Sequence, residues 1–184
     1  MNRLASPAQL RASLIRWALV IVPSVMLLGF LSGQLGGSSA NSPWFQMLEK
    51  PALFPPPATF GIVWTVLYFL MGLALAMVCA AWGSRLRMWA VLAFVVQFAI
   101  NLSWSPVFFA WHEIALGLYV IIALNVALIV TVMLFFKVRK WAGLLLLPYL
   151  AWTLFAAVLN WQFLQLNPDA SGVHNSGAAQ RIEL

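Results

Sequence analysis

The chain has 184 residues, of which 64% are hydrophobic and only 8% are charged. A soluble domain carries about 25% charged residues, so this composition excludes an ordinary soluble protein and indicates an integral membrane protein. No sustained alternation of polar and apolar residues is present, which argues against a β-barrel. The net charge of +6 would suit nucleic-acid binding, but its placement along the chain indicates another role.

Five apolar stretches are each long enough for the roughly 20 residues that cross a bilayer as a helix. They cover residues 15–33, 59–82, 88–110, 114–136 and 141–166. We therefore predict an all-α membrane protein with one domain over residues 1–166, a bundle of five transmembrane helices. The polar residues 167–184 are expected to form a flexible tail.

The charged residues divide unevenly between the two ends of this bundle. Eight of the ten basic residues fall on one side: Arg3, Arg11, Arg16, Arg85, Arg87, Lys137, Arg139 and Lys140. The acids Glu49, Glu113, Asp169 and Glu183 all fall on the other side. The positive-inside rule then places the N-terminus in the cytoplasm and the C-terminus outside, as in a bacterial inner membrane. The excess of basic residues is therefore explained by the orientation of the protein in the membrane, and no nucleic-acid partner is expected.

The first span follows a short arm over residues 1–13 and contains Pro23, which predicts a kink. Ser38-Ser39-Ala40 is a weak match to a signal-peptide cleavage site, but the apolar run is long for a signal peptide, so we expect the span to be retained. The loop over residues 34–58 starts with glycine and serine and becomes aromatic and proline-rich. Because prolines stiffen the backbone, this loop is expected to cover the mouth of a cavity.

Aromatic and amide side chains recur at helical spacing within three spans. They are Trp64 and Tyr68 in the second span, Gln97, Asn101, Trp104 and Ser105 in the third, and Pro148, Trp152, Ala156 and Asn160 in the fifth. Residues four apart share one face of a helix, and Pro106 is expected to bend the third span just after its polar face. With the predicted topology the three faces meet in the outer leaflet, beneath the loop. This arrangement indicates a pocket lined by indoles, with a few amides to orient a ligand.

Other interpretations of these residues stay open on the spacing alone. Trp17, Trp82, Trp89, Trp111 and Trp141 lie at span ends and are typical of interface anchors. The deeper Trp64, Trp104 and Trp152 fit either core packing or ligand contact. Gln97, Asn101 and Asn160 fit either ligand contact or interhelical hydrogen bonds, worth about 0.6–2 kcal/mol each.

The chain offers little to hold a metal. It has one cysteine, Cys79, and two histidines, His112 and His174, which lie outside the spans. No haem-attachment motif and no cluster of metal ligands is present in the sequence. We therefore expect no metal site and no covalently bound cofactor.

Three motifs stand out along the chain. The first runs from Trp44-Phe45 through Lys50-Pro51, Pro55-Pro56, Phe60 and Val63-Trp64-Thr65 to Tyr68 and Met71-Gly72. The second is Asn101-x-x-Trp104-x-Pro106-x-Phe108-Phe109. The third is Pro148-Tyr149-Leu150-x-Trp152, followed by Ala156 and Leu159-Asn160. Together they span residues 43 to 161, and in sequence and order they resemble the motifs of the TspO/MBR family, the tryptophan-rich sensory proteins and mitochondrial translocator proteins.

The resemblance implies a five-helix bundle, often a homodimer, with a pocket that opens toward one leaflet under the first loop. It implies a tetrapyrrole ligand, protoporphyrin IX or haem, and a role in sensing, sequestering or transporting porphyrins. Two alternatives are light-dependent porphyrin degradation by Trp64 and Trp152, and lipid or sterol transport. The expected ligand-binding residues are Trp44, Phe45, Trp64, Tyr68, Gln97, Asn101, Trp104, Trp152, Ala156 and Asn160.

The chain departs from the family pattern at two points, and the family properties that depend on these points are not expected here. Phe45 stands where the family has a tyrosine, so a phenol hydroxyl is missing. The cholesterol-recognition pattern needs a tyrosine and a basic residue after Leu159-Asn160, and neither follows, which argues against specific cholesterol binding. Because no histidine lies within a span, metal-free porphyrin is expected to bind about as well as haem.

Overall fold

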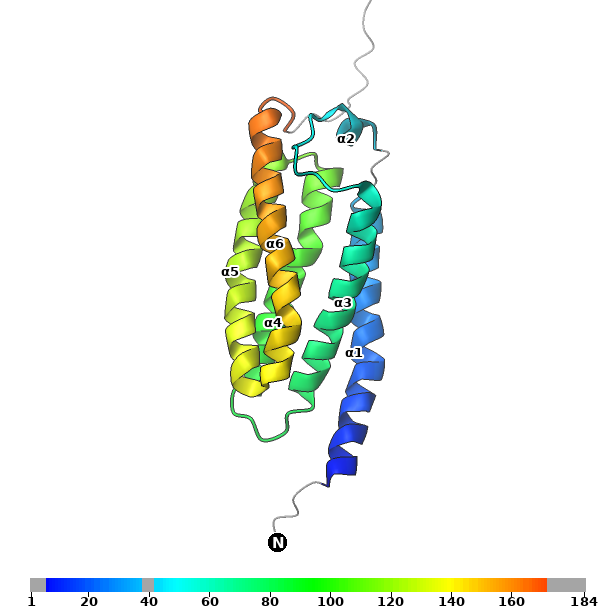
Figure 1. Ribbon diagram of the computed structural model, residues 1–184, viewed down its shortest axis with the longest axis vertical. Helices are drawn as coiled ribbons and strands as arrows, with labels where there is room; N and C mark the ends of the chain where they lie inside the picture. Colours follow the sequence, from blue (N-terminus) through cyan, green and yellow to red (C-terminus); the bar gives the residue numbers. More distant parts are fainter. Residues whose placement is uncertain (1–5, 38–41, 172–184) are drawn as a thin grey trace, which may run out of the picture.

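The computed structural model describes residues 6–37 and 42–171 and, over these, is a bundle of long helices (Figure 1). Its elements are α1 (Pro7–Leu35), α2 (Pro43–Met47), α3 (Pro57–Cys79), α4 (Arg87–Ser105), the π-helical turn η1 (Pro106–Ala110), α5 (Ile114–Val138) and α6 (Lys140–Leu166). Five of them, with η1 extending α4, are long and apolar enough to cross a membrane. The predicted all-α bundle with five spans is confirmed.

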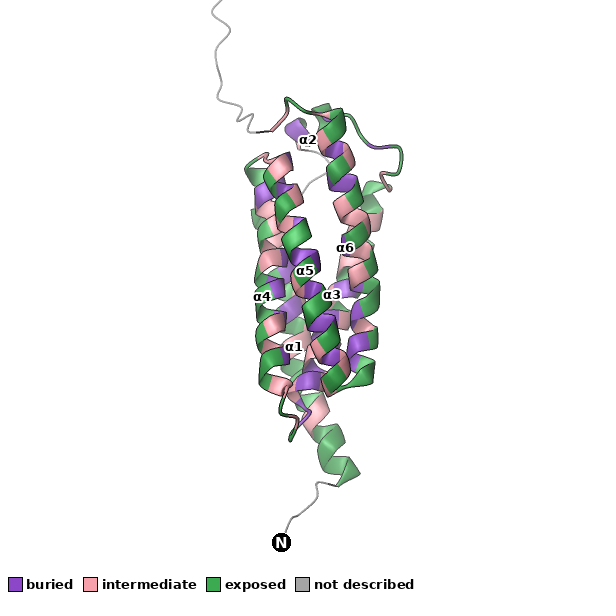
Figure 2. Cartoon of the chain, turned by 90° about the vertical axis from the view of Figure 1, so that its left-hand side faces the viewer, coloured by how far each residue is buried: buried purple, intermediate pink, exposed green. Residues whose placement is uncertain are grey.

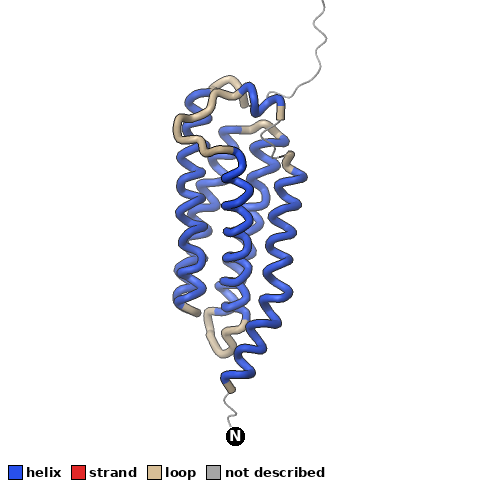
Figure 3. Tube along the Cα trace, turned by 45° about the vertical axis from the view of Figure 1, so that its right-hand side comes forward, coloured by secondary structure: helices blue, strands red, loops and turns tan. Residues whose placement is uncertain are grey.

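The five long helices close into a ring. α1 packs on α3, α3 on α6, α6 on α5, α5 on α4, and α4 and η1 on α1. Loops gather at the two ends of the bundle, and α2 lies across one of them (Figure 3). We call residues 42–56 the lid, because they run over that end between α1 and α3. The ring places α1, α3, α4, α5 and α6 around the space beneath the lid.

α1 begins at Pro7, so residues 7–13 of the predicted arm are helical. Ser6 caps the helix, because its hydroxyl accepts a hydrogen bond from the Gln9 amide nitrogen at 3.3 Å. The Gln9 side-chain oxygen accepts in return from the Ser6 amide nitrogen at 2.9 Å. This reciprocal capping box satisfies two amides that the first turn would leave unpaired, and the earlier start corrects the prediction.

The core fills the half of the bundle away from the lid. Met71, Phe94, Leu128, Phe135 and Tyr149 are buried there in one cluster. A second cluster joins the lid to the helix ends, with Trp44, Phe45 and Leu48 packed on Phe108 and Phe163. Exposed residues cover the outer faces of the helices (Figure 2). The space between the two clusters is therefore the part of the bundle that can hold a ligand.

The tryptophans predicted to be interface anchors are exposed and lie near helix ends. Trp17 is 37% exposed, Trp82 and Trp89 are 64%, Trp111 is 54% and Trp141 is 71%. Within the described residues, all basic residues except Lys50 lie at the end opposite the lid, on α1, the α3–α4 loop and the α5–α6 joint (Figure 1). This is the charge asymmetry on which the predicted topology depends.

Asn167 and Ala170 both contact the lid, so the flexible tail does not begin at residue 167 as predicted. Residues 172–184 and the weak cleavage site Ser38-Ser39-Ala40 lie outside the described residues. The homodimer implied by the family resemblance stays a prediction.

Candidate ligand-binding cavity

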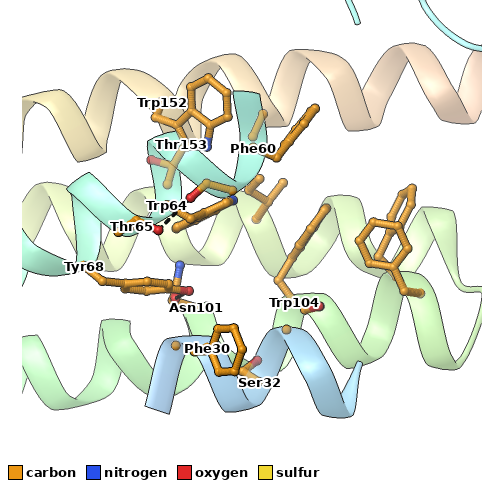
Figure 4. Close-up of a pocket in the computed structure, with 18 of the residues that line it drawn as sticks. Phe30, Ser32, Phe60, Trp64, Thr65, Tyr68, Asn101, Trp104, Trp152 and Thr153 are labelled. Carbon is orange, nitrogen blue, oxygen red and sulfur yellow. Dashed lines mark hydrogen bonds between the residues drawn. The ribbon is translucent and has the colours of Figure 1, made fainter. Parts of the chain in front are cut away.

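A cavity of about 780 Å³ lies between α1, α3, α4, η1, α5 and α6, directly under the lid. Eleven aromatic residues contribute to its wall: Phe30, Phe45, Phe54, Phe60, Trp64, Tyr68, Trp104, Phe108, Phe109, Trp152 and Phe163. Rings from different helices face one another across it (Figure 4). Its size falls within the range of about 300–1,000 Å³ that is typical of small-molecule sites.

The structure brings most of the predicted site residues into one wall. Phe45, Trp64, Tyr68, Asn101, Trp104, Trp152, Ala156 and Asn160 line the cavity. Trp44 and Gln97 are described but do not line it. Both residues make structural contacts instead.

Trp44 is buried inside the lid, and its ring stacks on His112 at 4.5 Å between ring centroids. Its indole nitrogen donates a hydrogen bond to the Ala170 carbonyl at 3.3 Å. Gln97 is buried in the core, and its side-chain oxygen accepts a hydrogen bond from the Tyr149 hydroxyl at 3.1 Å. Trp44 thus holds the lid in place, and Gln97 links α4 to α6.

Four polar side chains of the wall are hydrogen-bonded to one another in two pairs. The Tyr68 hydroxyl donates to the Asn101 side-chain oxygen at 3.1 Å, which leaves the amide nitrogen of Asn101 directed toward Trp64 (Figure 4). The Trp104 indole nitrogen donates to the Asn160 side-chain oxygen at 3.2 Å. Asn160 in turn donates to the Ile114 carbonyl at 2.9 Å. These bonds fix the side chains before any ligand arrives.

Two buried polar atoms of the wall have no hydrogen-bond partner, the indole nitrogen of Trp152 and the hydroxyl oxygen of Ser105. Buried polar groups are nearly always paired, so each such atom calls for an explanation. Both belong to residues that line the cavity, where a bound molecule with a hydrogen-bond acceptor would satisfy them. The indole of Trp152 also packs edge-on against Phe60, with centroids 5.7 Å apart.

Lys50 holds the lid in shape from within. The Lys50 ammonium donates to the carbonyl oxygens of Phe45, Gln46 and Leu48 at 2.9, 3.3 and 2.9 Å. A cation is favourable at a helix C-terminus, and here it collects the unpaired carbonyls of α2. The lysine-proline motif therefore shapes the lid and leaves the lysine nitrogen with three acceptors.

Asn167 clamps the lid to the end of α6. The Glu49 amide nitrogen donates to the Asn167 side-chain oxygen at 2.8 Å, and the Asn167 side-chain nitrogen donates to the Glu49 carbonyl at 2.9 Å. These two reciprocal hydrogen bonds join the backbone of the lid to the residue that follows α6. This role of Asn167 was not predicted from the sequence, because position 167 was assigned to the tail.

The lining includes α1, for which the sequence carried no signal. Leu27 and Phe30 on α1 are 58% and 64% exposed, yet both line the cavity. Gly61 and Thr65 on α3 also line it and are exposed. The cavity therefore reaches the membrane-facing surface along α1 and α3. Phe60 and Phe163 were missed too, although each is at helical spacing from a predicted residue, Trp64 and Asn160.

Comparison with known proteins identifies the family. The model of the TspO/MBR family matches residues 10–166. The tryptophan-rich protein TspO of Chlorobaculum tepidum is 40% identical over 126 residues, which cover 68% of this chain and 80% of that protein. Its Archaeoglobus fulgidus counterpart is 39% identical over 150 residues, 78% of this chain and 92% of that protein. The translocator protein of Sus scrofa is 33% identical over 144 residues, 77% of this chain and 83% of that protein. The chain therefore belongs to the TspO/MBR family of integral membrane proteins.

Proposed function

We propose that the protein binds tetrapyrroles in the cavity beneath the lid and serves in sensing, sequestering or transporting them. The observation that carries this proposal is the set of aromatic side chains in the cavity wall, which come from the four helices α1, α3, α4 and α6, from η1 and from the lid. A porphyrin is a flat, polarisable and largely apolar disc, and aromatic pairs contribute about 0.5–1.5 kcal/mol beyond the area they bury. Trp64, already stacked on Tyr68 at 5.2 Å, offers such a face.

The proposal predicts no strong preference for iron. No histidine or cysteine is among the described residues that line the cavity. Tyr68, a further ligand type for haem iron, is already hydrogen-bonded to Asn101. Haem and metal-free protoporphyrin IX are therefore expected to bind with similar affinity, and a tenfold preference for haem in a titration would contradict this.

The test is quenching of tryptophan fluorescence by protoporphyrin IX in detergent-purified protein. Wild type is compared with Trp64→Phe and Asn101→Ala, which change the wall, and with Trp89→Phe, which removes an exposed indole near the far end of α4. Saturable quenching that both wall variants weaken and Trp89→Phe leaves intact supports the proposal. Equal, non-saturating quenching in all four proteins means partition into the micelle and contradicts it.

A second candidate is light-dependent degradation of the bound porphyrin. It is favoured by the position of Trp64 and Trp152, which both line the cavity from the neighbouring helices α3 and α6 (Figure 4). An indole beside an excited porphyrin is an oxidisable neighbour. Trp64→Phe and Trp152→Phe are expected to slow the decay of porphyrin absorbance under light. Unchanged decay rates at saturating protein would eliminate this activity.

We also propose that the lid end faces away from the cytoplasm of a bacterial inner membrane. The support is the clustering of basic residues at the opposite end, since positive charge is retained on the cytoplasmic side. A reporter active only outside the cytoplasm, fused after residue 184, should be active. The same reporter placed in the α3–α4 loop after Gly83 should be silent, and the reverse pattern would overturn the orientation.

A further inference from the structure

The wall of the cavity carries no ionic side chain. None of its described residues is an aspartate, glutamate, lysine, arginine or histidine. Its polar groups are neutral hydroxyls, amides and indole N–H groups. Free porphyrin acids, in contrast, carry ionised carboxylates at neutral pH. An ionised carboxylate is costly to bury unless a cation or several hydrogen-bond donors meet it.

The lid end of the bundle does not provide the missing cation. Lys50 is the basic residue among the described lid residues, and its ammonium already donates to three carbonyl oxygens. An ammonium has three donors, so Lys50 has none left for a ligand. Its nitrogen also lies 5.1 Å from the centre of the Phe45 ring, within the lid itself.

The fixed charge around this end is mainly acidic. Glu49 lies in the lid, Glu113 at the start of α5 and Asp169 just after α6. The other described basic residues lie at the far end of the bundle (Figure 1). A helix of the length of α3 separates the two ends by roughly 35 Å, several times the Debye length of about 8 Å at physiological salt. A carboxylate at the cavity mouth would therefore meet like charge.

The neutral donors of the wall suit a different kind of ligand group. The Trp152 indole nitrogen is buried and unpartnered, and Asn101 directs its amide nitrogen into the cavity (Figure 4). Each can donate one hydrogen bond to an uncharged acceptor, such as the carbonyl oxygen of an ester or a ketone. Neutral hydrogen bonds satisfy such an acceptor fully, whereas they compensate only part of the desolvation of a carboxylate.

We propose that this cavity selects its ligand by charge, and takes flat tetrapyrroles whose carboxyl groups are esterified or absent in preference to the free dicarboxylic acids. The inference rests on the proposed tetrapyrrole binding and narrows its ligand class. Selection follows from the neutral wall, the occupied lysine and the acidic surroundings of the mouth. The reactions that consume or supply such a ligand would then act on tetrapyrrole esters.

The test compares protoporphyrin IX with its dimethyl ester at pH 8 in the same detergent. The two ligands share one ring and differ in charge. For wild type the ester is expected to bind about tenfold more tightly than the acid, since only the acid buries unpaired charge. Because the ester also partitions more strongly into micelles, the decisive quantity is the change in the acid-to-ester affinity ratio between variants.

Two lysine substitutions supply that comparison. Gln34→Lys places a cation on an exposed residue that lines the cavity near the lid end of α1. Leu35→Lys adds the same charge on the next residue, which is 80% exposed and is not part of the wall. Gln34→Lys is expected to improve binding of the acid several-fold and to leave the ester unchanged, while Leu35→Lys leaves the ratio near that of wild type.

The outcomes separate this inference from the proposed function. Saturable binding of both ligands with the acid equal to or tighter than the ester in wild type overturns charge selection and leaves tetrapyrrole binding standing. Equal effects of Gln34→Lys and Leu35→Lys on the ratio also overturn charge selection, because the effect would then be one of net charge. If neither ligand shows saturable binding to wild type, both proposals fail.

Discussion

The hydroxyl of Ser32 on α1 donates a hydrogen bond to the carbonyl oxygen of Leu102 on α4. Pro106 stands four residues after Leu102 and has no N–H, so the normal α-helical donor to this carbonyl is missing. Ser32 replaces that donor from a neighbouring helix. One turn further along α1, a Cβ on Gly36 would lie only 2.6 Å from the Ser105 hydroxyl. α1 and α4 therefore meet closely at the point where α4 changes into η1.

Ser32→Ala is expected to lower the stability of the folded protein by about 1 kcal/mol, the usual size of such bonds between membrane helices. Thermal unfolding in detergent measures the loss. Ser24→Ala is the matched control, because the Ser24 hydroxyl bonds only within α1, to the Val20 carbonyl at 2.7 Å. In a Pro106→Ala background, which restores the N–H, Ser32→Ala should cost less. An equal cost in both backgrounds would show that Ser32 does not compensate for the proline.

Two glycines of α3 should respond oppositely to alanine. A Cβ on Gly72 would lie 2.8 Å from the Cα of Val22 on α1, whereas a Cβ on Gly61 would meet nothing within 4 Å. Gly72→Ala forces the two backbones apart and is expected to destabilise by about 1–3 kcal/mol. Gly61→Ala is expected to be neutral or to stabilise by up to about 1 kcal/mol, from helix propensity. Comparable melting temperatures for the two variants would contradict this account of the α1–α3 contact.

The spans could be predicted from the sequence because the bilayer sets their length, and five apolar runs match that length. The helical period then placed Trp64, Asn101 and Trp152 each on the polar and aromatic face of its own helix. In the structure these three faces line one cavity. The periodicity of a sequence indicates which face of a helix carries polar and aromatic residues, but it does not indicate which other helix that face contacts. The contacts of α1 with α4 and of α3 with α6 join helices that are not neighbours along the chain, so the sequence pattern did not contain them.

Gln97 and Trp44 were predicted to line the cavity and do not, again because their contacts depend on the neighbouring elements. Gln97 shares a face with Asn101, but it lies one turn deeper, where the Tyr149 hydroxyl donates a hydrogen bond to its side-chain oxygen. Trp44 precedes Phe45 in the lid, and only Phe45 lines the cavity. In short segments such as α2 adjacent residues point in different directions, and their contacts depend on the elements beneath them.

Gln97 and Tyr149 are expected to behave as a buried pair that contributes to stability and not to ligand binding. Gln97→Leu leaves the buried Tyr149 hydroxyl without its acceptor and should cost about 1–3 kcal/mol. Adding Tyr149→Phe removes that unpaired hydroxyl, and the double variant should recover most of the loss. Thermal unfolding of the two single variants and the double variant measures the coupling. Porphyrin affinity should stay at the wild-type value in every folded variant, and a selective loss of affinity in Gln97→Leu would return Gln97 to the binding site.

Asn167→Ala is expected to loosen the lid while leaving the cavity intact. The substitution removes both hydrogen bonds between Asn167 and the Glu49 backbone, and these bonds hold the lid over the cavity that Phe45 and Phe54 help to close. An opened lid lowers the barrier to exchange, so association and dissociation of a bound porphyrin should both accelerate, about tenfold for a loss of about 1.4 kcal/mol. Affinity should change less than either rate, because the wall is unchanged. Stopped-flow fluorescence gives both rates.

Gln165→Ala is the matched control for the lid, since Gln165 is an exposed side chain on the last turn of α6. It should leave both rates unchanged. If Asn167→Ala also leaves both rates unchanged, exchange does not pass under the lid, and the route along α1 and α3, where Phe30 and Thr65 line the cavity from the membrane-facing surface, becomes the path to examine. Thr65→Trp would then be expected to slow exchange by filling that opening, while Asn167→Ala would affect only the thermal stability of the lid.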